Sequence, residues 1–340
     1  MLMKLICSKS NLLNGVQIVS KAVPSKTTMS ILECILIDAS KGVITLTAND
    51  MELGIETTIE GEIAEGGIIA LDAKIFVEIV RKLPDNDMTI ETDGTFKTTI
   101  TCEKAKFNII GKSGEDFSYL PMIEREDSIV ISQFTLKEVV RQTIFSISDN
   151  DTNKLMTGEL FEINGEELKV VSLDGHRISI RKIQLKDSYS PKKVVVPGKT
   201  LNEVSKILPG DAESDVIISF TDKHIVFEFD HTTVVSRLIE GEYFKVDQML
   251  SSDYETKVHI NKKELLAEEN LKKVFALFTK SENVENVSIS CTNFKNILGL
   301  SSKFSDKQWD TIIKTIDKNG DNEIEYDEFK DMMILFIGEG

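Results

Sequence analysis

Short runs in which apolar and polar residues alternate recur between residues 40 and 230 of the chain. Alternation with a period of two is typical of half-buried strands. The runs are Gly42–Leu46, Asp87–Glu91, Lys97–Cys102, Leu160–Ile163, Leu168–Val171, Asp215–Phe220 and His224–Phe229. Asp93-Gly94 and Asn164-Gly165 have the composition of hairpin turns. The pattern therefore predicts antiparallel meanders.

Apolar residues three and four positions apart predict four helices, at about residues 9–21, 73–82, 135–146 and 199–207. Thr135-x-x-Glu138 has the form of a capping box, which places a helix start there. Helices interspersed with antiparallel strands predict an α+β fold.

The predicted elements belong to a repeat. Ile69–Pro84 (IALDAKIFVEIVRKLP) matches Val194–Pro209 (VVVPGKTLNEVSKILP) at an offset of 125 residues. Thr47–Ile55 matches Ser172–Ile180 with a slip of one residue that pairs Asp50 with Asp174. A third copy begins at Ile260–Leu266 and does not continue. Self-similarity over this length indicates a duplicated domain.

Composition limits the class of protein. The chain has 340 residues, of which 41% are hydrophobic, and this suits two or three packed domains. No stretch approaches the roughly 20 apolar residues of a membrane span, and Met1–Leu5 lacks a secretory signal, so we expect a cytoplasmic protein without a membrane partner. The four cysteines lack metal-ligand spacing and are read as incidental thiols.

Charge and motifs narrow the function. A formal charge of −16 argues against coating nucleic acid by bulk charge, but it leaves room for a local basic surface. The chain has no Walker loop, GxGxxG after a strand, GxSxG or HExxH motif, so we expect no enzyme. All six prolines and four histidines precede Leu266, whereas the single tryptophan, Trp309, follows it. A module boundary is expected near Leu266.

Residues 1–266 resemble the bacterial DNA polymerase III beta sliding clamp. The resemblance rests on MKLICSKSNLLNGVQIVSKAV, LDAKIFVEIVRKLP, LFEINGEELKVVSLDGHRISI, VVVPGKTLNEVSKILP and SRLIEGEYF, of which LDGHR at Leu173–Arg177 is the most specific. It implies tandem DNA-clamp domains at residues 1–127 and 128–254, with antiparallel sheets outside and paired helices inside. Residues 255–266 are then the truncated start of a third domain.

The resemblance implies a processivity factor that surrounds duplex DNA and holds the replicative polymerase on it. Such a surface attracts phosphates through lysine and arginine without reading bases. The candidate DNA contacts on the inner helices and loops are Lys26, Lys74, Arg81, Lys82, Lys137, Arg141, Asn150, Lys199 and Lys206. Any one of these lysines could simply lie on a solvent-exposed helix face. Lys74 and Lys199, however, occupy equivalent positions in the two repeats, and basic residues follow both of them.

The family also has a hydrophobic pocket that accepts short peptides from polymerases and the clamp loader. The matching positions here are Gly175, His176, Arg177, Ile178, Phe244, Met249 and, less directly, Leu160. The family usually has proline where Phe244 stands, and the other wall comes from a third domain that is missing here. A simpler alternative for His176 and Arg177 is a turn held by Asp174 and Gly175.

The last part of the chain carries a different motif. Asp317–Glu328 fits the twelve-residue EF-hand loop, whose oxygen ligands suit Ca²⁺. The predicted ligands are Asp317, Asn319, Asp321, Glu323 through its carbonyl, Glu325 and Glu328. Asn322 stands at the sixth position, where glycine normally takes a positive φ, and Asn is the next most tolerant residue.

Flanking apolar stripes predict helices on both sides of this loop. One stripe includes Trp309 and follows a capping box at Ser305-x-x-Gln308, and the other runs from Phe329 to Phe336. A degenerate first loop, expected to hold no metal, lies between stripes around Phe275 and Phe294. Residues 267–340 thus resemble the EF-hand lobe of calcium-dependent protein kinases, which implies an all-α EF-hand pair with one calcium ion.

Three interpretations follow. The chain is a sliding clamp, natural or constructed as a chimera, whose third domain is replaced by a calcium-binding lobe. Because the family closes its homodimeric ring by docking domain one on domain three, ring closure is expected to be impaired. Alternatively, the working part is the calcium-binding sensor, carried on a clamp-derived scaffold. The third possibility is an unrecognised enzyme, although no acidic pair has a nucleophile or base beside it.

Overall fold

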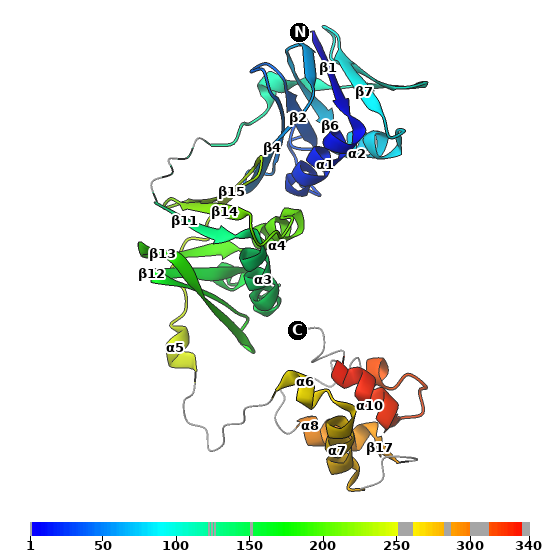
Figure 1. The fold of residues 1–340 in the computed structure, drawn as a ribbon, viewed down its shortest axis with the longest axis vertical. Helices are drawn as coiled ribbons and strands as arrows, with labels where there is room; N and C mark the ends of the chain where they lie inside the picture. The colour runs from blue at the N-terminus through cyan, green and yellow to red at the C-terminus, as the bar shows by residue number, and fades with distance from the viewer. Residues whose placement is uncertain are drawn as a thin grey trace. The chain divides into compact units, whose positions relative to one another are not determined.

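The computed structural model describes residues 2–121, 123, 125, 127–149, 152–250, 261–281, 287–299 and 313–334. The chain divides into two compact units, Met1–Phe244 and Lys245–Gly340. The first unit contains antiparallel sheets with helices packed against them, and the second contains short helices with one small sheet (Figure 1). This bears out the α+β class for the first unit.

The first half of the Met1–Phe244 unit alternates strands with two helices. Strands β5, β1, β7, β8 and β9 form a five-stranded antiparallel sheet in that order. The elements are β1 Met3–Ser8, α1 Lys9–Val19, η1 Ser20–Ala22, β2 Cys34–Asp38, β3 Ile44–Asn49, β4 Leu53–Ile59, β5 Glu62–Glu65, β6 Ile68–Asp72, α2 Ala73–Lys82, β7 Asp87–Thr92, β8 Lys97–Cys102, β9 Ala105–Ile110, β10 Lys112–Ser113 and η2 Gly114–Asp116.

The second half repeats this order with longer strands. Its elements are β11 Asp127–Ser132, α3 Gln133–Thr143, η3 Ile144–Ser146, η4 Lys154–Thr157, β12 Gly158–Leu173, β13 Ile178–Pro197, α4 Gly198–Ile207, β14 Asp215–Phe220, β15 His224–Phe229 and β16 Thr232–Arg237. Strands β12 and β13 form a sheet of their own. The other four strands join the first half in a nine-stranded sheet, in the order β10-β6-β2-β3-β4-β16-β15-β14-β11.

The two halves meet where β4 pairs with β16. Ile55 lies opposite Val234 in this antiparallel register, and both belong to the same hydrophobic core. Side chains opposite each other in a register share one face of the sheet. Helix α1 packs on β3 and β4, and α3 packs on β11 and β14, with α2 against α1 and α4 against α3. All four helices therefore belong to the layer on this one face.

The α3 helix begins two residues earlier than the sequence predicted. Ser132 is its N-cap, and its hydroxyl accepts the N–H of Thr135 at 3.2 Å. Thr135 is thus a helical residue, and its predicted capping box with Glu138 was wrong. The α-helix ends at Thr143 and continues as one 3₁₀ turn, η3, so the predicted end near residue 146 included that turn.

Asn164-Gly165 is not the hairpin turn that the sequence predicted. Strand β12 runs through it without reversing, and its register with β13 shifts on both sides of Gly165. Gly165 has φ of 61°, which glycine adopts without steric cost. A bulge absorbs this residue because the apolar runs on either side pair with the same neighbouring strand. The chain reverses instead between Leu173 and Ile178.

The Lys245–Gly340 unit has its own small core. Its elements are α5 Val246–Met249, α6 Lys262–Leu265, α7 Glu268–Thr279, β17 Ser288–Ser290, α8 Cys291–Gly299, a helical turn at residues 313–316, β18 Glu323–Glu325 and α10 Tyr326–Met333. Phe275, Phe294 and Phe329 are fully buried in this core. Ser305, Gln308, Trp309 and Phe336 lie outside the described residues. None of the helices in the described part is long and apolar enough to cross a membrane.

Candidate functional site

The helix layer carries a net positive charge, although the chain as a whole is acidic. Helices α1 to α4 and the turn η1 contain nine lysines and arginines but only three glutamates, a local charge of +6 in a protein of formal charge −16. Two of these basic residues, Lys9 and Lys21, were not among the predicted DNA contacts, although the first predicted helix, at about residues 9–21, contains both.

Part of this charge is paired within helices α2, α3 and α4. Glu78 contacts both Arg81 and Lys82, Glu138 accepts two hydrogen bonds from Arg141 at 3.0 and 2.9 Å, and Glu203 accepts one from Lys206 at 2.7 Å. These pairs are at least partly exposed to solvent and hold their partners weakly. These lysine and arginine side chains therefore stay available to a stronger anion such as phosphate.

The other predicted DNA contacts have mixed environments. Lys199 forms an ion pair with Asp50, which bridges the two halves of the unit, and Lys137 donates to the carbonyl of Leu208 at 3.0 Å. Lys26 and Lys74 are exposed, and neither has an ion-pair partner in the part of the chain that the structure describes. Asn150 lies outside the described residues.

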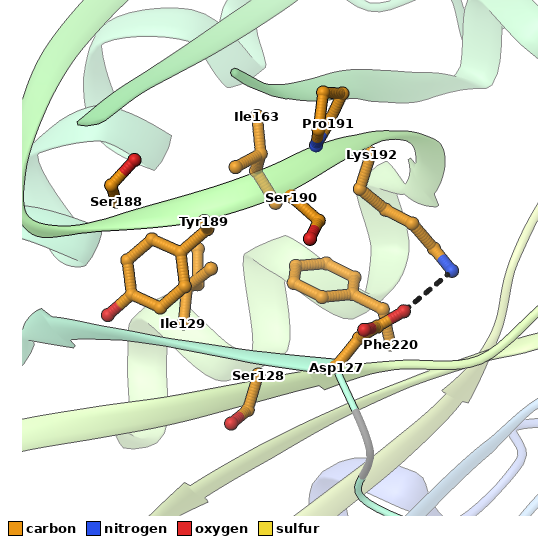
Figure 2. A pocket seen from close by; sticks show the side chains of 10 residues that line it. All are labelled: Asp127, Ser128, Ile129, Ile163, Ser188, Tyr189, Ser190, Pro191, Lys192 and Phe220. Atoms are coloured by element: carbon orange, nitrogen blue, oxygen red, sulfur yellow. Dashed lines mark hydrogen bonds and ion pairs between the residues drawn. The ribbon is translucent and has the colours of Figure 1, made fainter. Parts of the chain in front are cut away.

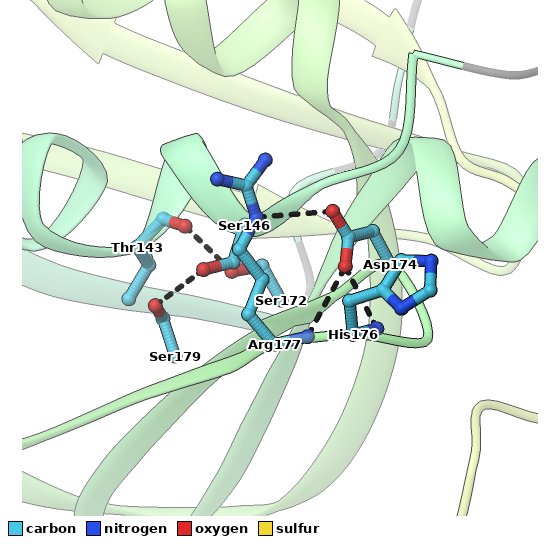
Figure 3. A network of polar contacts seen from close by, with 7 residues as sticks. All are labelled: Thr143, Ser146, Ser172, Asp174, His176, Arg177 and Ser179. Atoms are coloured by element: carbon cyan, nitrogen blue, oxygen red, sulfur yellow. Dashed lines mark hydrogen bonds and ion pairs between the residues drawn. The ribbon is translucent and has the colours of Figure 1, made fainter. Parts of the chain in front are cut away.

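The predicted peptide-site residues Gly175, His176 and Arg177 form one tight turn between β12 and β13. The carboxylate of Asp174 accepts the backbone N–H groups of His176 and Arg177 at 3.0 and 3.2 Å, and Gly175 has φ of 87° (Figure 3). Partial burial acts to raise the pKa of Asp174, but these hydrogen bonds and the Arg177 guanidinium outweigh it and lower the pKa. The turn is thus held rigidly, as the simpler alternative supposed.

The surroundings of this turn offer apolar surface. Arg177 donates from Nε to Asp174 at 3.0 Å and also lies 5.9 Å from the ring centroid of Phe145, which is 57% exposed. Close to the turn, the hydroxyl oxygens of Ser146 in η3 and Ser179 in β13 lie 2.6 Å apart (Figure 3). Phe145 was not predicted, because it lies outside the segments on which the family resemblance rests.

The remaining predicted peptide-site residues are spread more widely. Leu160 is buried in β12, Ile178 is half-buried at the start of β13, and Phe244 packs edge-to-face on Tyr243 with 5.5 Å between ring centroids. Met249, which is 54% exposed, belongs to the Lys245–Gly340 unit. The structure therefore brings together the four residues of the turn, while Met249 lies in the other compact unit.

A cavity of about 250 Å³ in this half lies between the bulged β12–β13 pair and β11 (Figure 2). Tyr189 closes one side of it, because its hydroxyl accepts the N–H of Val130 at 3.3 Å. Lys192 and Asp127 form an ion pair at 3.4 Å across its rim. The charged groups at this rim thus satisfy each other.

The loop from Asp317 to Glu328 is folded by its own side chains. Asp317 accepts the N–H groups of Gly320 and Asn322 at 2.7 and 3.0 Å, and the buried Glu328 accepts that of Lys318 at 2.9 Å. Asn322 has φ of 64°, the left-handed conformation that this position requires. Among the described residues no three His, Cys, Asp or Glu side chains are gathered as a metal-binding group.

This loop is also tied to the segment before α8. Ile289 of β17 lies opposite Ile324 of β18, and the backbone N–H of Cys291 donates to the carbonyl of Asn322 at 2.9 Å. The donor set of the loop consists of carboxylate, amide and carbonyl oxygens, which is the chemistry that suits Ca²⁺. The residues present therefore fit a calcium ion in type and order.

Comparisons with known proteins identify the family of the chain, and the match to one relative extends into the Lys245–Gly340 unit. The family model for the N-terminal domain of the DNA polymerase III beta subunit matches residues 3–121, and the model for its central domain matches residues 130–245. A beta sliding clamp of Staphylococcus epidermidis is 32% identical over 96% of this chain and 93% of that protein. One from Staphylococcus aureus is 36% identical over 79% of this chain and 76% of that protein.

Solved structures agree. A putative DNA polymerase III beta subunit from Eubacterium rectale is 74% identical, with a TM-score of 0.76 over 82% of this chain and 75% of that one. The sliding clamp of Bacillus subtilis is 34% identical, with a TM-score of 0.75 over 82% and 74% of the two chains. The tandem α+β domains thus define a DNA-clamp architecture. The chain belongs to the beta sliding clamp family of DNA polymerase III beta subunits.

Proposed function

We propose that this protein is a sliding-clamp processivity factor that binds duplex DNA without sequence preference and carries partner proteins along it. The observation that carries the proposal is the charge of the helix layer, +6 within a chain of −16. Lysine and arginine contacts to phosphates fix a protein on DNA without reading bases. The proposed activity is binding and includes no covalent step, in agreement with the expectation from motifs.

DNA binding by the helix layer can be tested with matched triple variants. Replacing Lys82, Arg141 and Lys206 by alanine should weaken binding to a labelled 30-base-pair duplex at least tenfold at 50 mM salt. It should also reduce the slope of log affinity against log salt by up to about 3, because each phosphate contact contributes roughly 0.9. Fluorescence anisotropy measures both quantities.

The matched control removes three exposed strand lysines, Lys97, Lys106 and Lys186. This triple should leave both the affinity and the salt slope near their original values. If the two triples weaken binding equally, the helix layer is not the DNA-binding surface.

We further propose that the Asp174–Ile178 turn, together with Phe244, forms one wall of a peptide site for polymerase and clamp-loader segments. The rigid turn and the exposed ring of Phe145 beside it support this role. Because the family's second wall comes from a third clamp domain, such peptides should bind this chain weakly.

Calcium binding by the Asp317–Glu328 loop is a separate proposal, favoured by the positive φ of Asn322 and by the oxygen donors along the loop. The residues that would hold the ion are Asp317, Asn319, Asp321, Glu323 through its carbonyl, Glu325 and Glu328. Bound calcium would supply positive charge that draws these oxygens together. The alternative function, a calcium sensor carried on a clamp scaffold, rests on this site.

Isothermal titration calorimetry of the full chain should detect one calcium ion per molecule. Glu328→Gln keeps the helix-capping geometry but removes a carboxylate ligand, so it should weaken binding at least tenfold. Asp327→Asn, which changes an acid of the same loop outside the ligand positions, should leave the affinity within about twofold. Absence of heat at millimolar calcium in the unmodified protein would contradict the proposal.

A last proposal concerns ring closure. Strand β9 is an edge strand that leaves Phe107 39% and Ile110 73% exposed, and Phe107 lines a cavity of about 420 Å³ beside α2. In its described part, the Lys245–Gly340 unit has helices and one sheet of two three-residue strands, and it does not repeat the sheets of the Met1–Phe244 unit. We propose that the chain does not close a ring by itself.

A further inference from the structure

A cavity of about 280 Å³ lies where the two halves of the Met1–Phe244 unit meet. Val235 of β16 lines the cavity, and the residue before it, Val234, faces the hydrophobic core under the helices. Because successive strand residues face opposite sides, the cavity opens on the sheet face away from the four helices. Its apolar lining is Met51, Leu53, Tyr119, Leu120, Pro121 and Val235.

One wall of the cavity is the linker at residues 118–121, which follows η2. The side-chain amide of Asn49 donates to the carbonyl of Ser118, which fastens the segment after η2 to the sheet. Leu120 packs so closely over Gly54 that a Cβ atom at this glycine would lie 2.0 Å from its Cδ2 atom. The linker therefore forms a wall in a defined position, and the cavity is preformed.

The other wall is a strained turn. Asp50 accepts the N–H groups of Glu52 and Leu53 at 3.0 and 2.7 Å, while Met51 has φ of 75°. A methionine in this conformation is unfavourable, and strain of this kind tends to persist at binding sites. The turn has the same construction as Asp174 to Arg177, its partner in the repeat, with methionine in place of Gly175.

The rim of the cavity carries unsatisfied positive charge. The guanidinium of Arg237 has no ion pair or hydrogen bond within the described part of the chain, and Glu52 is the single acid in the lining. Burial, together with the charges of Arg237 and Lys223, lowers the pKa of His224 and thereby favours its neutral form. An unpaired guanidinium beside an apolar cavity is complementary to a carboxylate.

We propose that this cavity is a second peptide-binding site, which takes a short segment with one or two bulky apolar side chains next to a carboxylate that contacts Arg237. Its volume lies just below the usual range for small-molecule sites, which suits one or two side chains. Of the described residues, Arg237 is the one lysine or arginine that lines the cavity, and a single guanidinium favours a single carboxylate over a polyphosphate. The site is independent of the DNA-binding and calcium proposals, because it lies on the opposite face of the sheet from the helices.

The test uses two probes, N-acetyl-Leu-Phe with a free carboxylate and the same dipeptide as its C-terminal amide. Each is titrated into the full ¹⁵N-labelled chain and followed by amide chemical shifts. The acid should shift the amides of Met51, Leu120 and Val235, and it should bind about fivefold more tightly than the amide because of the charged hydrogen bond to Arg237.

Two variants and one control complete the test. Arg237→Ala should abolish the difference between acid and amide, and Met51→Gly should weaken both several-fold while relieving the strained backbone, so that this variant keeps its fold. Arg181→Ala, at an exposed arginine of β13 that belongs to neither peptide site, should change neither affinity. Unchanged binding in both site variants, or shifts confined to the Asp174 turn, would overturn the proposal.

Discussion

Glu159 lies in β12 with its carboxyl fully enclosed and neither oxygen hydrogen-bonded within the described structure. Burial raises its pKa to about 8, and the nearby Thr143 hydroxyl opposes this shift only in part. Burial also raises the pKa of Tyr243, and the negative charge of an ionised Glu159 adds to that rise. Glu159 is therefore protonated at neutral pH, and its ionisation would place an unpaired charge in the core.

This makes the stability of the Met1–Phe244 unit dependent on pH. Below pH 4.5 the carboxyl is protonated in both folded and unfolded states, and between 4.5 and 8 only the folded state keeps its proton. Stability from this group is therefore lost as pH rises through that window. From pH 5 to 8, the free energy of unfolding should fall by on the order of 4 kcal/mol relative to Glu159→Gln, which stays neutral.

Urea unfolding at pH 5, 6.5 and 8, followed by far-UV circular dichroism, measures this difference. Glu166→Gln, an exposed glutamate on the same strand, serves as the matched control and should parallel the unmodified protein. Parallel curves for Glu159→Gln and the unmodified protein would show that Glu159 ionises without penalty.

At the scale of elements, the fit of α1 on the sheet depends on Gly15. A Cβ atom at this buried position would lie 2.6 Å from Ile59 Cγ2 and 2.8 Å from Leu46 Cδ1. Gly15→Val should therefore destabilise the unit by about 1–3 kcal/mol through overpacking. Because α1 belongs to the basic layer, its displacement should also weaken DNA binding.

Gly94→Val is the matched control, since nothing lies within 4 Å of a Cβ atom at that exposed turn residue. Its free energy of unfolding should stay within about 0.5 kcal/mol of the original. Denaturant titration of both variants checks the pair. Equal effects would mean that α1 shifts on the sheet without cost.

At the scale of the whole molecule, the open edge at β9 bears on assembly. If the chain cannot close a ring, light scattering should give the mass of a monomer, 38.1 kDa, with calcium and with a chelator. A dimer that is independent of calcium would mean that the Lys245–Gly340 unit restores ring closure. The alanine variant of Phe107 would then distinguish an interface at β9 from one elsewhere, because only the former should be weakened.

The sequence by itself determined the repeat and the elements within it. Helix α2 matches its predicted range of residues 73–82, and the pairing of Asp50 with Asp174 corresponds to two turns of the same construction. These features depend on local periodicity and on side chains that bond to their own backbone, so neighbouring residues are enough to reveal them. The family resemblance over residues 1–266 rests on the same local segments.

Tertiary structure decided what depends on distant residues. Asn164-Gly165 became a bulge because β13 pairs on both sides of it, and the choice between bulge and turn cannot be made from the dipeptide. The junction of β4 with β16 and the cavity beside Arg237 each join segments more than 80 residues apart. The fold also encloses Glu159, whose neighbours in the sequence give no sign that it is buried. Such features arise from tertiary packing, and the local sequence pattern does not predict which surfaces will pack together.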